Sequence, residues 1–507
     1  MLARVISACL MGIEAALVRV EVDVSHGLPS FATVGLPDPA IRESRDRVRA
    51  AIRNSGYAFP QERVTVNLAP ADLRKEGVSF DLAIALGLLA ASGAIRSDRL
   101  PTLLVAGELA LDGTIHPVRG VLPMALAAAR GRLPGCLLAP GNAAEAAVVD
   151  GLAVYPVTSL AEAAAFLNGE RVVEPAAVDG ERLLGAGRED DADFADVRGQ
   201  AHAKRGLEIA AAGGHNVLML GPPGTGKTML ARRLPTILPP LALAEALEVS
   251  AVWSVAGLLP PHGLVLRRPF RAPHHTTSDA GLVGGGRGPH PGEASLAHLG
   301  VLFLDELPEF HQHVLETLRQ PLEDGEVVVA RAGGSVTFPA EFQLVAATNP
   351  CRRGCRGLEE CVCTPGERAR YLARLSGPLL DRIDVFLEVP PVAYRELEAA
   401  GPGGEASAEI RRRVLAARQR QRARFGRGRV RVNARMTPRQ VGRHCALGLE
   451  GRQLLGQAVD RLGLSARAHD RVLKVARTIA DLAGQEAIAV EHLAEALRYR
   501  RLDRWTG

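Results

Sequence analysis

The chain has 507 residues, of which 47% are hydrophobic and 23% charged, and its formal net charge at pH 7 is +5. This composition is typical of a soluble globular protein with two or three domains and substantial cores. Because no apolar run reaches about eighteen residues, and Met1–Ile6 continues into strand-like alternation, the sequence predicts neither a transmembrane helix nor a signal peptide. We therefore expect a cytoplasmic protein without membrane contact.

Residues 1–170 form the first predicted unit. Alternation of apolar and polar residues predicts strands over Ala16–Val24 and Val64–Leu68. Helical spacing of apolar residues predicts an amphipathic helix over Asp38–Asn54 and a buried helix over Asp81–Ser92. Both strands and helices are therefore expected in this unit.

Two segments of this unit, Lys75–Asp81 and Gly107–Leu122, resemble the proteolytic domain of Lon protease. The second segment also predicts a hairpin around its Asp-Gly pair. In the Lon fold a lysine activates a serine nucleophile. Ser79 stands at the nucleophile position, but Leu122 replaces the lysine, and Lys75 belongs to the wrong segment. The resemblance therefore implies a Lon-protease-like α+β domain without peptidase activity.

Residues 171–195 are polar, rich in Gly and Asp, and weakly periodic, which predicts a linker. The next predicted unit covers residues 196–395. Its first strong motif, Gly221–Thr228, reads GPPGTGKT. The motif follows a predicted strand, Asn216–Leu220, and opens into a predicted helix, Met229–Leu234, which is the context that a phosphate-binding loop requires.

Backbone N–H groups of such a loop hold the phosphates of a nucleoside triphosphate. Lys227 adds a positive charge, and the hydroxyl of Thr228 is placed to ligate Mg²⁺. The residues predicted to contact the nucleotide are Gly221, Pro222, Pro223, Gly224, Thr225, Gly226, Lys227 and Thr228.

Two inserts follow the loop. A glycine-rich stretch, Gly284–Arg287, comes after the pair His274–His275, which lacks an acidic partner at ligand spacing and is interpreted as structural. A second hairpin is predicted over Glu326–Phe338. Arg287 and Arg331 lie at the predicted tips, where they would follow a phosphate backbone or serve as ordinary surface charges.

Two further apolar runs end in polar residues. Val301–Leu304 is followed by Asp305 and Glu306, as expected of a buried parallel strand with functional groups at its carboxyl end. Asp305 is predicted to hold hydrated Mg²⁺, and Glu306 to polarise the water that attacks the γ-phosphate. The run Leu344–Thr348 leads to Asn349, which is predicted to orient that water or to contact the γ-phosphate.

The chain contains seven cysteines, which in a cytosolic protein argue against a disulfide framework. Four of them lie in residues 351–363 with the spacing C-x3-C-x5-C-x-C. They are Cys351, Cys355, Cys361 and Cys363. Such a cluster suits tetrahedral Zn²⁺, although the C-x-C step is tight. The alternatives are a redox-responsive group and unligated thiols.

Residues 396–507 are predicted to form a helical domain. The predicted helices are Ala406–Arg424, one capped by Thr437 with Pro438 at its first position, Ser465–Gly484 and Val490–Arg500. Thirteen arginines lie between residues 411 and 443. Since the chain has only four lysines, this bias partly reflects codon composition.

The order of phosphate loop, Asp-Glu strand and Asn strand resembles that of AAA+ ATPases. The two inserts, together with GEASLAHLGVLFLDEL and SARAHDRVLKVARTIADLAG, resemble the magnesium-chelatase-like family over nearly the whole chain. One departure is the wide spacing of Cys351 and Cys355, which the family tends to keep closer. The resemblance implies an α/β multidomain fold with a Lon-protease-like domain, a central AAA+ αβα phosphate-loop domain and a C-terminal helical lid domain.

The resemblance also assigns roles to residues. It implies ATP as the nucleotide with Mg²⁺, and places residues near Gln200 at the adenine pocket. Arg382, in Gly377–Asp384, would supply positive charge to the nucleotide of a neighbouring subunit. In the lid, Arg467, or alternatively Arg471, would reach the γ-phosphate.

The family implies a homohexameric ATP hydrolase that translocates on single-stranded or branched DNA. Such a branch-migration helicase would act in recombination of incoming DNA during natural transformation. An alternative is a chelatase-like motor that remodels a protein partner. A DNA motor requires several basic contacts per subunit and binds with steep salt dependence, which distinguishes the two. A third reading, an active serine peptidase coupled to a motor, is disfavoured by Leu122.

Overall fold

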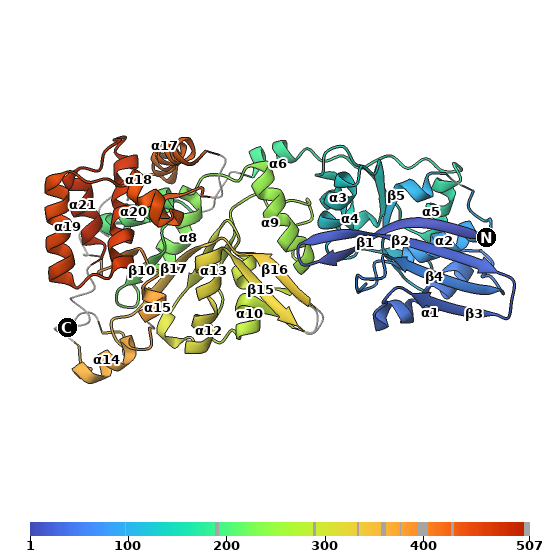
Figure 1. Ribbon diagram of the computed structural model, residues 1–507, viewed down its shortest axis with the longest axis horizontal. Coiled ribbons are helices and arrows are strands. Elements are labelled where there is room, and N and C mark those ends of the chain that lie inside the picture. The colour runs from blue at the N-terminus through green and yellow to red at the C-terminus, as the bar shows by residue number, and fades with distance from the viewer. Residues whose placement is uncertain are drawn as a thin grey trace.

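The structure is a computed structural model. It describes residues 1–96, 98–187, 192–286, 290–331, 334–355, 361–375, 377–392, 404–426 and 430–500. Arg287 and part of the predicted linker therefore lie outside the described residues. The molecule is elongated, with the N-terminal unit at one end, a parallel sheet in the middle and C-terminal helices at the other end (Figure 1). Among the described helices, none combines the length and apolar character needed to cross a membrane.

The N-terminal unit is built on a seven-stranded mixed sheet with the order β3-β4-β2-β1-β5-β8-β9. Its strands are β1 Leu2–Met11, β2 Glu14–Ser25, β3 Ser30–Val34, β4 Arg63–Ala69, β5 Leu103–Ala106, β8 Gly135–Leu138 and β9 Ala153–Pro156. β1 and β2 form a long antiparallel pair, whereas β5, β8 and β9 run parallel. The predicted strands of this unit correspond to β2 and β4.

Helices cover both faces of this sheet. One face packs on α1 Pro39–Asn54, α2 Asp81–Ala91 and α5 Leu160–Leu167, and the other on α3 Val121–Arg130 and α4 Pro140–Ala147. Leu103 and Val105 of β5 enter the first core, and Leu104 and Ala106 enter the second, as the two-residue period of a strand requires. The predicted hairpin forms as β6 Glu108–Leu109 and β7 Ile115–His116.

The central unit contains a five-stranded parallel sheet with the order β11-β14-β17-β10-β18. Its strands are β10 Val217–Leu220, β11 Phe270–Arg271, β14 Val301–Leu304, β17 Gln343–Thr348 and β18 Val385–Glu388. Every residue of β10, β14 and β17 is buried, because helices cover both faces. The predicted parallel-sheet domain is therefore present.

One face of the central sheet packs against α7 Ala201–Gly213, α8 Lys227–Ile237 and α17 Ser407–Phe425, and the other against α10 Asp279–Val283, α12 Gln312–Thr317 and α13 Arg319–Asp324. The C-terminal helices extend the first layer. They are α18 Pro438–His444, α19 Leu449–Leu462, α20 Ala466–Leu482 and α21 Val490–Arg498. Thr437 caps α18 as predicted, whereas α19 was not predicted.

The N-terminal and central units share a packed boundary. Helix α9, Leu243–Ala256, lies against α3, and Ser254 O accepts a 3.1 Å hydrogen bond from Gly120 N. Helix α6, Gly180–Ala186, lies inside the predicted linker 171–195, and its Leu184 joins the same core. The predicted linker segment therefore contains a helix, which makes apolar contacts with the shared core.

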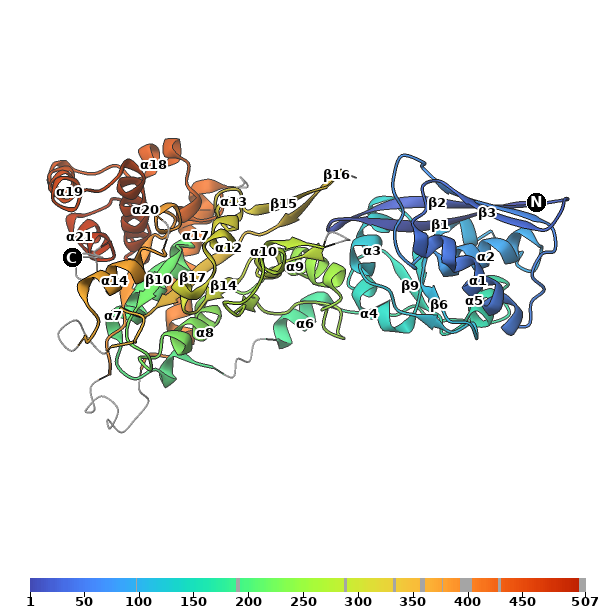
Figure 2. The same ribbon diagram turned by 90° about the horizontal axis from the view of Figure 1, so that it is seen from below.

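The second predicted insert forms an antiparallel pair, β15 Glu326–Arg331 and β16 Gly334–Pro339. This hairpin projects from the central sheet toward the N-terminal unit (Figure 2). At Gly12, in the turn between β1 and β2, an added Cβ would lie 2.8 Å from Val336 Cγ1. The hairpin thus touches the turn of the longest strand pair. The first insert contains β12 Gly284–Gly285 and β13 His290–Pro291.

Candidate functional site

The phosphate loop leaves the carboxyl end of β10 and enters the N-terminus of α8. Gly224 and Gly226 have φ angles of +77° and +91°, a region in which residues with a Cβ are strained. At Gly221 an added Cβ would lie 2.2 Å from Val389 O. Three of the loop glycines are therefore required by backbone geometry, and the loop directs the first N–H groups of α8 toward a bound anion.

Lys227 is the buried cation of this loop. Its Nζ donates to Gly221 O at 2.6 Å, to Pro222 O at 2.8 Å and to Asn349 Oδ1 at 3.1 Å. Burial lowers the pKa of Lys227, while the carboxylates of Asp305 and Glu306 oppose that change. The ammonium group is thus held between the phosphate loop and the end of β17, where the sequence predicted Asn349.

Thr228, in the first turn of α8, and Asp305, which directly follows β14, come together in space. Thr228 Oγ1 donates to Asp305 Oδ2 at 2.7 Å. A hydroxyl and a carboxylate are hard oxygen donors that suit Mg²⁺, which keeps several waters and binds through few protein ligands. The donor set therefore fits the predicted ion, whose role would be to neutralise charge on the β- and γ-phosphates.

Glu306 stands beside this pair with half of its side chain exposed to solvent. Its φ angle of +51° is unusual for a residue with a Cβ, and its N–H donates to Asp305 Oδ1 at 2.9 Å. Strained backbone of this kind is concentrated at functional sites, and the half-exposed carboxylate is accessible to water.

His275 is a neighbour of Glu306 that the sequence did not predict. Its Nδ1 lies 3.8 Å from Glu306 Oε2, and its ring meets Phe310 edge-on. In sequence, the pair His274–His275 is interpreted as structural because it lacks an acidic partner at metal-ligand spacing. The tertiary path of the insert, which spacing rules do not encode, brings the imidazole to the carboxylate.

A cavity of about 620 Å³ adjoins the phosphate loop. Besides loop residues, it is lined by Asp196, Arg198, Met229, Pro391 and Val392. Gln200 Nε2 donates to Pro390 O at 2.6 Å at the same end of the unit, where the sequence placed the adenine pocket. The volume suits a nucleotide base and sugar next to the phosphates.

The predicted arginines gather at another place. Arg382 is buried, pairs with Glu323 and donates to Pro378 O at 2.6 Å. Its pKa is lowered by burial and by the like charges of three further arginines, although Glu323 opposes this effect. These three are Arg319, Arg467 and Arg471. We refer to Arg319, Arg382, Arg467 and Arg471 as the arginine face.

The arginine face lies at the amino ends of the strands. Asp384 N donates to Asn216 O at 3.0 Å, which places this segment just before β10 and β18 begin. The phosphate loop leaves the opposite end of β10, four residues and about 13 Å further along. Among the described residues, no hydrogen bond or ion pair joins the face to that loop. Neither Arg467 nor Arg471 therefore reaches the phosphate loop of its own chain.

Asp384 anchors the arginine face from within. Its carboxylate pairs with Arg471 at 2.5 Å, accepts from Asn216 N at 3.2 Å and lies 3.4 Å from His215 Nδ1. Burial acts to raise the pKa of Asp384, but Arg471 and His215 outweigh burial and hold that pKa below its usual range. Arg471 is thus committed to an internal pair, whereas Arg467 is exposed.

The four predicted cysteines converge. The Sγ atoms of Cys351, Cys355, Cys361 and Cys363 all lie within 4.8 Å of one another. Cys355 N donates to Cys351 Sγ at 3.3 Å, an N–H···S bond that orients the sulfur. At Gly354, between these two cysteines, an added Cβ would lie 2.6 Å from Pro223 Cγ. The cluster is therefore packed against the phosphate loop.

The structure also shows the surroundings of Ser79, the candidate serine of the N-terminal unit. Ser79 is buried, and among the described residues no hydrogen bond joins its hydroxyl to a titratable side chain. Leu122 lies in α3, and Lys75 is buried with its Nζ bonded to Pro70 O.

Three family models of magnesium chelatase subunit ChlI match the chain. The model described as "Subunit ChlI of Mg-chelatase" matches residues 20–142, "Magnesium chelatase, subunit ChlI" matches 193–397, and "Magnesium chelatase, subunit ChlI C-terminal" matches 404–500. The matches therefore cover all three structural units.

Full-length relatives are similar over nearly their whole length. The chain is 47% identical to "Competence protein ComM" of Haemophilus influenzae over 505 residues, which covers 99% of this chain and 98% of that protein. It is 45% identical to "Uncharacterized protein YifB" of Escherichia coli over 97% of this chain and 96% of that one. A magnesium-chelatase 38 kDa subunit of Rhodobacter capsulatus is 29% identical over 45% of this chain and 69% of that subunit.

Proposed function

Because the chain belongs to the magnesium-chelatase-like family, in the type represented by ComM and YifB, we propose that it is a homohexameric motor that moves on single-stranded or branched DNA. The family itself carries an AAA+ type of ATP-dependent function that uses ATP and Mg²⁺. The proposed activity is branch migration during recombination of incoming DNA, in keeping with the name of the competence relative.

The proposal of a homohexameric ring rests on one observation, the separation between the arginine face and the phosphate loop of the same chain. Four arginines converge at the amino edge of the sheet, and they have no nucleotide phosphate of their own chain within reach. A second copy stacked with its phosphate loop against this face would supply one. Arg382 and Arg467 then stabilise the charge that develops at the γ-phosphate, while Glu306 of the nucleotide-holding subunit takes a proton from the attacking water.

The projecting hairpin β15–β16 supports DNA as the track. It extends beyond the central sheet and starts directly after α13, which carries Arg319 of the arginine face (Figure 2). A movement of α13 at the proposed interface between the arginine face and the neighbouring subunit's nucleotide would therefore be passed directly to the hairpin that would contact DNA. Arg331 ends β15 and is the predicted phosphate contact.

A synthetic four-way junction tests the proposal. We expect the wild-type chain with ATP and Mg²⁺ to convert the junction into two duplexes, and the Glu306→Gln chain to bind the junction without converting it. A strictly monomeric chain in the presence of ATP, or equal conversion with a non-hydrolysable ATP analogue, would contradict the proposal. The control is Glu309→Gln, which removes a nearby carboxylate that does not contact the phosphate loop, and it should behave as wild type.

The relation to magnesium-chelatase subunits supports a second candidate, a motor that remodels a protein partner. The two functions differ in their salt dependence. A motor on DNA loses affinity for its track steeply as salt rises, because bound cations are released from phosphates. A junction that neither binds nor raises ATP turnover would favour the protein-remodelling function.

The proposal includes a structural Zn²⁺ at the four cysteines. Zinc–sulfur bonds of about 2.3 Å in a tetrahedron place sulfurs about 3.8 Å apart, and the four Sγ atoms already lie within 4.8 Å. Cys351 follows Asn349 by two residues, and Gly354 touches Pro223. The ion would therefore fasten the end of β17 to the phosphate loop.

Metal content tests this site independently of activity. Chain purified without added chelator or metal is expected to contain one Zn²⁺ per subunit by mass spectrometry, and Cys361→Ser is expected to lose most of it. Cys445→Ser, at a buried cysteine outside the cluster, is the matched control. Full zinc content in Cys361→Ser, or none in the wild type under reducing conditions, would disprove the site.

A further inference from the structure

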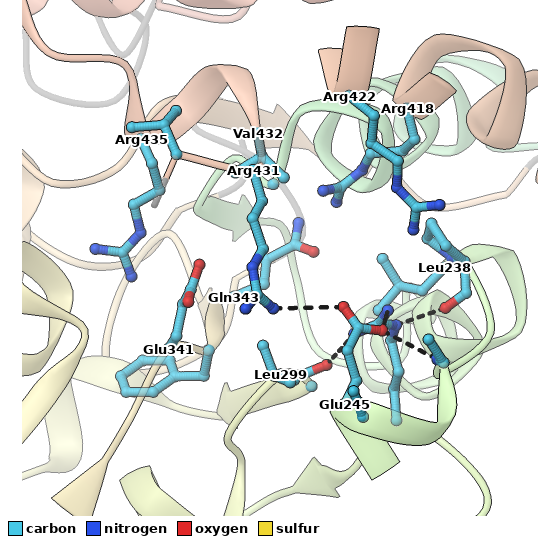
Figure 3. Close-up of a pocket in the computed structure, with 18 of the residues that line it drawn as sticks. Leu238, Glu245, Leu299, Glu341, Gln343, Arg418, Arg422, Arg431, Val432 and Arg435 are labelled. Carbon is cyan, nitrogen blue, oxygen red and sulfur yellow. Dashed lines mark hydrogen bonds and ion pairs between the residues drawn. The ribbon is translucent and has the colours of Figure 1, made fainter. Parts of the chain in front are cut away.

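A second cavity, of about 540 Å³, opens at the amino edge of the central sheet, away from the phosphate loop (Figure 3). Gly214, Gly300 and Gln343 line it where β10, β14 and β17 begin, and α17 and residues 430–435 form its other wall. Its charged lining is Arg268, Arg418, Arg422, Arg431, Arg435, Glu245 and Glu341. Five positive and two negative side chains give this cavity a formal charge of +3.

The glutamates do not balance these arginines. Glu245 forms an ion pair with Arg268 at 2.9 Å and a longer one with Arg431 at 3.6 Å. Arg418 donates through Nε and Nη2 to one neutral acceptor, Ala211 O, at 3.2 and 2.7 Å. The backbone carbonyl of Arg422 accepts from Gly426 N, but its guanidinium group has no ion pair or hydrogen bond with any other described residue. At least two guanidinium groups therefore enter the cavity without a carboxylate partner.

Keeping these charges together costs free energy in the folded chain. Arg418 and Arg422 lie one turn apart on α17 and both point into the cavity, and like charges at this spacing destabilise a helix (Figure 3). Burial, together with Arg268, lowers the pKa of Arg418 to about 9, which leaves the group charged at neutral pH. A bound anion would offset both costs, since guanidinium groups pair with anionic oxygens through two parallel hydrogen bonds.

We propose that this cavity binds a phosphate group, and that its source is the backbone of a nucleic-acid strand. The choice of source rests on the proposed DNA function and on position. Arg435 donates to Leu322 O at 2.9 Å and to Glu323 O, near the end of α13, which leads into β15. Glu341, on the opposite wall, comes two residues after the end of β16. The cavity thus lies at the base of the projecting hairpin. A nucleic-acid strand that ran along the hairpin would reach the cavity there.

The test compares two double variants that each remove two positive charges from the C-terminal unit. Arg422→Ala/Arg431→Ala removes cavity arginines with exposed side chains, and Arg412→Ala/Arg439→Ala removes exposed arginines outside the cavity. Binding of a fluorescent oligothymidylate is measured by anisotropy over a range of salt, with a non-hydrolysable ATP analogue bound. We expect the cavity variant to bind at least about tenfold more weakly and its salt slope to fall by about 0.7, the value for one lost contact with a single-strand phosphate, while the control keeps the wild-type slope. ATP turnover without DNA should be equal in all three proteins.

A second arm identifies the source of the phosphate. Pyrophosphate is titrated into the same proteins by calorimetry, with the analogue again filling the nucleotide site. Pyrophosphate binding that only the cavity variant loses, with unchanged oligonucleotide binding, would support the phosphate site and assign it to a free phosphate ligand. Equal behaviour of the two double variants in both arms would overturn the phosphate site while leaving the DNA function intact. A wild type that binds no oligonucleotide would instead contradict the proposed function.

Discussion

Asn349 Oδ1 accepts a hydrogen bond from Lys227 Nζ at 3.1 Å, which joins the end of β17 to the phosphate loop. Lys227 keeps two backbone acceptors in the loop without this bond. Asn349→Ala is therefore expected to bind ATP within about threefold of wild type but to turn it over about a hundredfold more slowly, because a group that positions the reacting atoms is lost. Equilibrium binding of a fluorescent ATP analogue and steady-state turnover measure the two effects. Equal losses in binding and turnover would show that Asn349 only supports the loop.

Gly354 tests the contact between the cysteine cluster and the phosphate loop. Its φ angle is +65°, and an added Cβ would meet Pro223 at 2.6 Å. Gly354→Ala is expected to weaken ATP binding several-fold, since a left-handed alanine costs about 1 kcal/mol and the clash displaces the loop. Gly366→Ala, at a glycine with open space around it, is the matched control and should bind ATP normally. Unchanged ATP affinity in Gly354→Ala would show that the loop does not depend on the cluster.

Glu145, at the boundary between the N-terminal and central units, makes the stability of the folded protein depend on pH. Burial raises the pKa of its carboxyl group, although hydrogen bonds from Ser254 Oγ, Asn142 Nδ2 and Leu122 N act against this change. Because the folded protein holds this proton more tightly than the unfolded chain, the associated stability is present at low pH and is lost as pH rises through the raised pKa.

Glu145→Gln has no proton to lose at this position. Its melting temperature relative to wild type is therefore expected to increase from pH 5 to pH 8. Differential scanning calorimetry at several pH values measures the difference, and a difference that stays constant or decreases with pH would contradict the raised pKa. Glu14→Gln, at the exposed first residue of β2, serves as the control for a removed carboxylate.

Much of the nucleotide site could be predicted from the sequence because its signals are local. Continuous apolar runs identify strands buried on both faces, and side chains that follow parallel strands meet at one edge, as Thr228 and Asp305 do. Likewise, the spacing of four cysteines within thirteen positions was enough to predict the cluster.

Other parts depend on the path of the chain in space. His275 reaches Glu306 only because the insert folds back over the sheet, and no spacing rule encodes that return. The distance in space between the arginine face and the phosphate loop could not be predicted from the sequence, because it depends on the direction in which β10 and β18 run. Helix α9 packs into a core shared by two units, so apolar residues are distributed around it without the one-sided pattern of a surface helix.

Mixed oligomers test the central claim, that one subunit's arginines act on the nucleotide held by the next. Arg382→Ala retains Glu306, and Glu306→Gln retains Arg382, so each variant alone is expected to be nearly inactive. The two chains, carrying different affinity tags, are co-expressed and purified through both tags in succession. We predict that DNA-stimulated ATP turnover reappears in these mixed oligomers, since some seams combine an intact Glu306 with an intact Arg382. Turnover no higher than that of either parent variant would contradict the account.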